Sequence, residues 1–226
     1  MPSRRQCPID LRAKLAVMTT SDDRGTPRRP VHFGPEAMEA HGGTTPGPAE
    51  LTEIAHQTAA VIVGAAREAH DPEVTAKLVS LVDELGLSTI ADLWSGRPAR
   101  SLPGVLWRLY VLREWVRRSP DAASREYAAG MRLTDVNHAV AGVAVPPGPD
   151  EVRSLADAIL TGVFDGDLGI ALDRASAFCA VISAGRAALA DDVEHPHAET
   201  ERAARMLQTS HDLRASAALW RADDLS

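Results

Sequence analysis

Cysteine is almost absent from this chain of 226 residues, in which only Cys7 and Cys179 occur. Two cysteines at this separation exclude a disulfide framework and a CxxC metal or redox site. Cys179 lies in an apolar stretch with helical spacing, so we expect it to be a small core residue. Lysine is equally scarce, at Lys14 and Lys77 only, while arginine and alanine are abundant. This bias is typical of a GC-rich genome, such as that of an actinobacterium, and carries no functional signal.

Long hydrophobic runs are missing as well. The longest uninterrupted apolar stretch, Ala59–Ala66, covers only a fraction of the roughly 20 residues that a membrane-spanning helix needs. The N-terminus lacks the charged and then apolar pattern of a secretory signal. We therefore expect a cytoplasmic protein that does not enter a membrane. Its composition, 45% apolar and 24% charged, is that of a globular protein with a sizeable core.

Complete signatures of known chemistry are also missing. The chain contains no GxGxxG, Walker A, GxSxG, HExxH or complete EF-hand loop. The stretch from Asp165 to Gly169 begins like a calcium loop, but its twelfth position is Ser176 where a bidentate Glu is required. We interpret it as a turn between helices. Whether the chain is an enzyme stays open, because catalytic residues that are distant in sequence can come together when the chain folds.

The net charge of −7 conceals a basic N-terminal arm. Residues 1–47 mix Pro, Gly, Thr, Ser and Arg without sustained periodicity, which predicts an irregular, polar arm or linker. Basic residues outnumber acidic ones within residues 1–34; the basic set is Arg4, Arg5, Arg12, Lys14, Arg24, Arg28 and Arg29. A basic arm on an acidic body can contact nucleic acid or an acidic partner, or fold onto its own protein.

A helix-start signal recurs through the rest of the chain: a proline followed by an acidic residue, as in Asp71-Pro72-Glu73. Proline at the first helical position gives up an amide hydrogen that has no intrahelical partner there, and the acid complements the positive end of the helix dipole. The apolar residues that follow have helical spacing. Helices are predicted at residues 48–69, 72–85, 88–95, 103–118, 120–131, 149–164, 168–190 and 196–222.

The predicted fold is all-α. Only residues 139–145 resemble a strand, and one strand cannot form a sheet. We predict a multi-helix bundle of about seven to eight helices, forming a single domain over residues 48–226 behind the irregular N-terminal arm. The helix at 168–190 is built largely of Ala, Gly and Ser, which let neighbouring helices approach closely. We expect this helix near the centre of the bundle.

The main candidate binding surface is a region rich in tryptophan and arginine, residues 94–118. Arginine forks and aromatic faces together bind phosphates, nucleobases or carboxylates. The candidate residues are Trp94, Arg97, Arg100, Arg108, Arg113 and Arg117, interleaved with Trp107, Tyr110 and Trp115. The competing interpretation assigns the aromatics to the core and the arginines to a solvated face or to ion pairs with acidic helices.

The second candidate is a site for a divalent metal at His195, His197 and Glu199. Imidazole and carboxylate ligands together suit zinc, manganese, iron or nickel. The spacing His-x-His is common by chance, however, and a solvated loop in an acidic protein has the same composition. In that alternative, Pro196 and Glu199 simply start the last helix.

Two further patterns are weaker. Glu53-x-x-His56 has the spacing of ferritin-like two-metal bundles, but the only similar motif, Asp135-x-x-His138, lies in a segment that contains Gly142 and a predicted helix break. Residues 82–94 resemble a helix-turn-helix segment, yet the second helix offers no Arg or Lys to DNA.

Three functional hypotheses follow. The leading one is a non-enzymatic interaction domain that uses residues 94–118 to bind another protein or a second copy of itself. The alternative is a metal-dependent or small-molecule enzyme that uses the cluster at His195 and His197. The third is a regulator that contacts nucleic acid through residues 97–118 and the basic arm.

Overall fold

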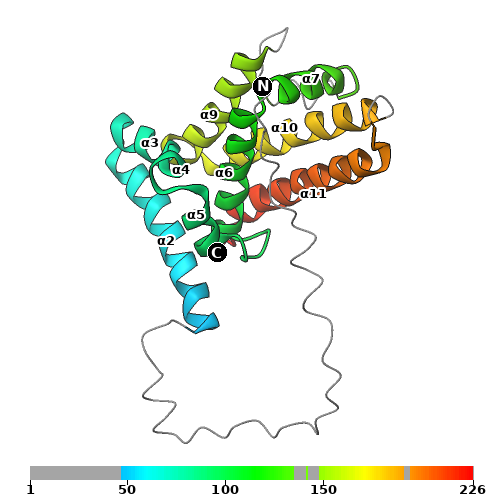
Figure 1. Cartoon of the computed structure of the whole chain (residues 1–226). Helices are drawn as coiled ribbons and strands as arrows, with labels where there is room; N and C mark the ends of the chain where they lie inside the picture. Colours follow the sequence, from blue (N-terminus) through cyan, green and yellow to red (C-terminus); the bar gives the residue numbers. More distant parts are fainter. Residues whose placement is uncertain (1–46, 135–140, 142–147, 191–193, 226) are drawn as a thin grey trace, which may run out of the picture. The chain divides into compact units, whose positions relative to one another are not determined.

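The all-α architecture predicted from the helix-start signals is confirmed in the computed structural model of the chain (Figure 1). The structure describes residues 47–134, 141, 148–190 and 194–225. Within these residues it is 84% helical, with nine helices and no strand. The helices are α2 (Pro48–Ala69), α3 (Pro72–Val79), α4 (Leu81–Leu85), α5 (Leu87–Trp94), α6 (Leu102–Arg118), α7 (Pro120–Met131), α9 (Pro149–Asp165), α10 (Leu168–Ala188) and α11 (Pro196–Arg221).

The helix starts follow the local chemistry from which they were predicted. Proline occupies the first helical position of α2, α3, α7, α9 and α11. Two acidic side chains cap helices directly: Asp71 accepts a hydrogen bond from the Glu73 amide (2.8 Å), and Asp167 accepts one from the Ile170 amide (3.1 Å). The stretch that resembles a calcium loop is therefore a turn that ends α9 and caps α10.

One predicted helix is divided. The segment 72–85 forms α3 and α4, separated at Ser80. The Ser80 hydroxyl donates to the carbonyl oxygens of Ala76 (3.1 Å) and Lys77 (3.2 Å), and the Tyr110 hydroxyl donates to the Leu78 carbonyl oxygen (2.6 Å). The bonds of Ser80 resemble those that Thr58 and Thr161 make within unbroken helices, so the bond from Tyr110 is the feature that distinguishes this position. The segment predicted as a strand, residues 139–145, lies outside the described residues except for Ala141.

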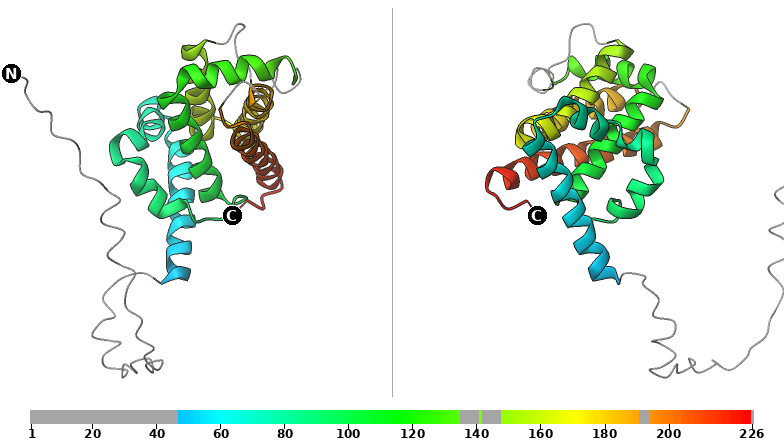
Figure 2. Two further views of the ribbon diagram at one scale, coloured as in Figure 1. Left: turned by 45° about the vertical axis from the view of Figure 1, so that its right-hand side comes forward. Right: turned by 90° about the vertical axis from the view of Figure 1, so that its left-hand side faces the viewer.

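α10 lies at the centre of the core, as its small residues predicted. It packs against α7, α9 and α11, and Figure 2 shows α11 running alongside it. α10 is long and apolar enough to cross a membrane by length and composition, but 72% of that window is buried within the protein. The burial explains its apolar composition: these side chains face other helices. Pro46–Ser226 forms one compact unit.

Candidate functional site

Trp94 is a core residue. Its side chain at the end of α5 is only 1% exposed, its indole nitrogen donates to the Thr58 hydroxyl (3.3 Å), and its ring stacks on that of Tyr110 with the ring centroids 6.2 Å apart. The prediction that Trp94 lines an accessible surface is therefore wrong. The reason is that α5 turns this residue toward α2 and α6.

Arg97 and Arg100 hold the loop before α6 in place. Arg97 donates to the Thr52 hydroxyl on α2, and the Nε of Arg100 lies 3.0 Å from a carboxylate oxygen of the buried Asp212 on α11. Each arginine thus joins the loop to a helix distant in sequence. Neither side chain lines the clefts that Trp107 and Trp115 border.

Arg113 and Arg117 connect α6 to acidic side chains on neighbouring helices. Arg113 is 7% exposed, and its Nε lies 2.5 Å from Asp157 on α9. Arg117 binds Asp83 on α4, which Arg113 also approaches. The hydrogen bond from Arg117, aided by the positive charges of both arginines, lowers the pKa of the Asp83 carboxyl, although its partial burial opposes this shift. The alternative interpretation, ion pairing with acidic helices, is correct for these two arginines, and Arg113 is not an accessible binding residue.

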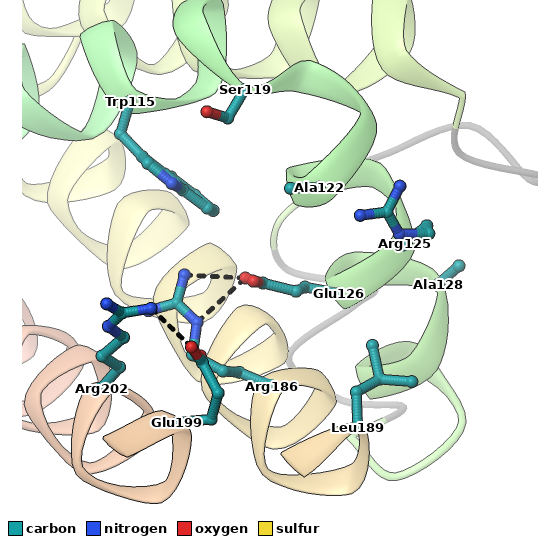
Figure 3. A pocket seen from close by; sticks show the side chains of 10 residues that line it. All are labelled: Trp115, Ser119, Ala122, Arg125, Glu126, Ala128, Arg186, Leu189, Glu199 and Arg202. Carbon is teal, nitrogen blue, oxygen red and sulfur yellow. Dashed lines mark hydrogen bonds and ion pairs between the residues drawn. The ribbon is translucent and has the colours of Figure 1, made fainter. Parts of the chain in front are cut away.

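The other face of α6 borders a groove made of two adjoining clefts. The wide cleft has a volume of about 890 Å³ and the narrow cleft about 300 Å³, and both are lined by Trp115 and Arg186. The wide cleft is lined by Trp115, Ser119, Ala122, Arg125, Glu126, Ala128, Arg186, Leu189, Glu199 and Arg202 (Figure 3). The narrow cleft is lined by Trp107, Arg108, Val111, Leu112, Trp115, Arg186, Met206 and Thr209. The walls are therefore α6 and α7 on one side and α10 and α11 on the other.

Arg186 lies where the two clefts meet. Its Nε and Nη2 bind the same carboxylate oxygen of Glu126, at 3.1 and 2.8 Å, and its guanidinium carbon lies 5.2 Å from the ring centroid of Trp115. Figure 3 shows the Glu126 carboxylate pointing at this guanidinium. The side chains of Arg186 and Glu126 are only 12% and 17% exposed. The pair is thus a fixed feature of the groove, because charge-assisted bonds and ring stacking both orient the guanidinium.

The remaining charges of the wide cleft differ in their pairing. Arg202 binds Glu199 one turn earlier on α11, at 2.5 Å. Arg125, on the exposed side of α7, has no hydrogen bond or ion pair with any residue that the structure describes. The cleft therefore presents one free guanidinium beside two that are already bound to carboxylates.

The narrow cleft is more apolar. Trp107, Val111 and Trp115 follow one another at intervals of four residues on α6, and Val111 is 36% exposed. Across the cleft lies Met206 of α11. Arg108 borders this cleft and donates to the Gly104 carbonyl oxygen (2.8 Å); burial lowers its pKa, which the charge of Asp212 opposes. Of the six residues predicted as the binding surface, Arg108 alone lines the groove.

Four charged groove residues were not predicted from the sequence: Arg125, Glu126, Arg186 and Arg202. They come from three helices and meet only through tertiary packing. One signal was available, since Arg186 is the only charged residue between positions 175 and 190, in an otherwise apolar and small-residue stretch. A lone charge in a central helix needs a partner.

The predicted metal ligands are not assembled in the described part of the chain. His195 precedes α11 and is exposed; His197 is 93% exposed and lies 3.4 Å from Glu201. Glu199 is bound by Arg202 and lines the groove. Among the described residues, no group of three or more His, Cys, Asp or Glu side chains is arranged to hold a metal ion. Residues 191–193, which include two of the neighbouring aspartates, lie outside them.

The two weaker patterns are placed as follows. Glu53 accepts a hydrogen bond from Gln57 (2.8 Å) on the exposed face of α2. The similar motif at Asp135 and His138 lies outside the described residues. The segment resembling a helix-turn-helix forms α4 and α5, joined at Gly86, whose φ of 81° favours glycine. Comparison with profiles of known protein families, with curated proteins and with solved structures gave no match.

Proposed function

We propose that this protein is a non-enzymatic interaction domain whose groove binds a segment of a partner protein carrying both apolar and acidic side chains. The observation that carries the proposal is the composition of the groove. It combines the two half-buried indoles of α6 and the exposed Val111 with four arginines, two of which, Arg108 and Arg125, have no ion pair within the described residues.

Charge supports an acidic occupant. The groove holds four arginines and two glutamates on a chain whose net charge is −7, so it is a positive site on a negative protein. An acidic segment would be attracted to the groove and repelled from most of the remaining surface.

The dimensions support a short segment. Trp107 and Trp115 are separated by eight residues on α6, which is about 12 Å at 1.5 Å per residue. Two turns of a partner helix, or roughly four residues of an extended strand at 3.3 Å each, span this distance. Tryptophan, arginine and methionine are also the residue types enriched at the energetically important centres of protein interfaces.

Selection from a random-sequence peptide library displayed on phage tests the proposal. We expect enrichment of peptides in which Asp or Glu accompanies Leu, Phe or Trp. Val111→Glu should weaken their binding by roughly tenfold or more, because it places a charge at the apolar centre. Arg125→Glu should weaken binding less, with an effect that shrinks as salt is added.

Matched controls lie outside the groove. Val61→Glu makes the same substitution at a 67% exposed valine of α2, and Arg132→Glu reverses an exposed arginine at the end of α7. Both should bind the peptides as wild type does. Absence of enrichment, or enriched peptides that bind Val111→Glu normally, would refute the proposal. A groove-dependent self-dimer in light scattering, or groove-dependent binding of a random oligonucleotide, would also contradict it.

A further inference from the structure

Arg186 differs from the other arginines of the described residues because it belongs to both clefts at once. A segment lying along the groove must pass it. Its guanidinium is also held rigidly: Glu126 engages Nε and Nη2, and the Trp115 ring covers one side. A donor that is held in place before binding loses less conformational entropy when a ligand arrives.

One edge of this guanidinium is unused. One bond to Glu126 comes from Nε and the other from Nη2. No described residue accepts a hydrogen bond from the third nitrogen, Nη1. The side chain is nevertheless 12% exposed, so part of it reaches the space of the cleft. A hydrogen bond made there to an anion is stronger than one in open water, because the surroundings are mostly protein.

The charged side chains around Arg186 are positive on balance. The wide cleft contains Arg125, Arg186 and Arg202 against Glu126 and Glu199, which leaves one positive charge. A carboxylate neutralises the wide cleft, but Arg108 of the narrow cleft adds a second positive charge to the groove. Net charge therefore favours an anion, and the phosphate probe described below separates a carboxylate from a phosphate.

We propose that Arg186 is the specificity-determining residue of the groove and that its Nη1 donates to one carboxylate of the bound segment, next to apolar side chains held by Trp115 and the narrow cleft. This inference rests on the proposed function, since it names the chemical group that the groove selects. Glu126 acts as a positioning residue, because it fixes the guanidinium through the opposite edge.

The direct test uses small probes and needs no natural partner. 4-Phenylbutyrate, 4-phenylbutan-1-ol and 4-phenylbutyl phosphate share an aromatic group and differ in the terminal group. Binding is followed through the ¹H–¹⁵N signal of the Trp115 indole, assigned with Trp115→Phe. We expect the carboxylate to bind roughly tenfold more tightly than the alcohol, and the phosphate to bind no more tightly than the carboxylate.

Two variants separate recognition from folding. Arg186→Lys keeps the positive charge but loses the planar fork, and the double variant E126Q/R186Q replaces the ion pair with two amides that can bond to each other. Both should fold, as checked by circular dichroism, and both should bind acid and alcohol within about threefold of each other. Arg132→Ala, outside the groove, should keep the full preference. Equal binding of acid and alcohol by wild type, a preference that survives in both variants, or tighter binding of the phosphate would overturn the inference.

The library peptides then locate the carboxylate and separate the two proposals. Loss of binding on changing Asp to Asn, or Glu to Gln, assigns it to a side chain; loss on amidating the last residue assigns it to a chain terminus; either supports the inference. If neither change matters while Val111→Glu still abolishes binding, the proposed function stands and the role of Arg186 is refuted. If no peptide is enriched, the proposed function fails, and the small probes still decide whether Arg186 selects carboxylates.

Discussion

Gly130 of α7 and Gly185 of α10 each lie against the backbone of the other helix. A Cβ atom on Gly130 would lie 1.9 Å from the Val181 carbonyl oxygen, and one on Gly185 would lie 1.7 Å from the Glu126 carbonyl oxygen. The two helices can approach this closely only because both positions lack a side chain. The same approach places Glu126 beside Arg186, the residue that follows Gly185.

The first prediction concerns this crossing. Gly185→Ala should lower the free energy of unfolding by roughly 1–3 kcal/mol, because the new methyl group forces the helices apart, even though alanine favours helix by about 1 kcal/mol. Urea denaturation measures the change. Gly64→Ala on α2, where no atom lies within 4 Å of the added Cβ, is the matched control and should be neutral or stabilising. Equal effects of the two substitutions would contradict the close approach.

The second prediction compares two arginines that share a partner. Arg113→Ala should destabilise the fold by about 1.5–3 kcal/mol, because it removes charge-assisted bonds made by a buried side chain. Arg117→Ala should cost about 0–1 kcal/mol, as expected of an exposed ion pair. The two side chains are 8% and 39% exposed and both approach Asp83, but only Arg113 also forms an ion pair with Asp157, so the two arginines differ in burial and in their number of carboxylate partners. Unfolding by urea gives both values, and an Arg117→Ala variant that is the less stable of the two would show that the assignment of roles is wrong.

The helix starts, unlike these tertiary contacts, follow from local sequence. The helix starts at Pro48, Pro120, Pro149 and Pro196 were predictable because a cap or a first-turn proline acts within a few residues. The break at Ser80 was not, because the bond that distinguishes this position comes from Tyr110, a residue 32 positions beyond Leu78.

The candidate site was less predictable than the fold. Trp94 was predicted to belong to a binding surface, because the sequence does not say whether another helix covers it. The region 94–118 does contain the two tryptophans that line the groove, Trp107 and Trp115. Most of its arginines, however, form ion pairs within the fold. Arg186 and Glu126, 60 residues apart, meet only because two glycines allow their helices to touch.

The third prediction follows from the lowered pKa of Asp83. Its ordinary pKa is 3.8, and a carboxyl whose pKa is lower in the folded than in the unfolded state stabilises the fold above that value. This contribution is lost as the pH falls from about 4 through the lower folded pKa. Wild type should therefore lose more stability than Asp83→Asn between about pH 6 and pH 2.5, as followed by urea unfolding. Parallel losses in both proteins would show that Asp83 is not linked to stability.

The fourth prediction concerns Cys179, which is fully buried in α10. Burial raises the pKa of its thiol to about 12, and the charge of Arg186 opposes this shift. Because the thiolate is the reactive form, almost none is present at about pH 8 in the folded protein. A Cys7→Ser variant, in which Cys179 is the only thiol, should react with Ellman's reagent no faster than the protein unfolds, and at once in strong urea. Rapid reaction under native conditions would mean that this part of the core is open to solvent.

The last prediction tests the charge of the groove without any ligand. The Trp115 ring is half-buried and lines the wide cleft together with three arginines, while Trp94 is 1% exposed. An anionic quencher is concentrated near positive charge and a cationic one is excluded, so iodide should quench the Trp115 fluorescence more strongly than caesium at equal ionic strength. Trp115→Phe should remove much of this iodide-sensitive component, whereas Trp94→Phe should leave it unchanged.

Arg125→Glu should reduce iodide quenching and increase caesium quenching, because it changes the sign of the one unpaired charge in the wide cleft. Arg132→Glu should do neither. If the two ions quench equally in wild type, the groove is not electropositive, and the preference for an acidic segment loses its physical basis.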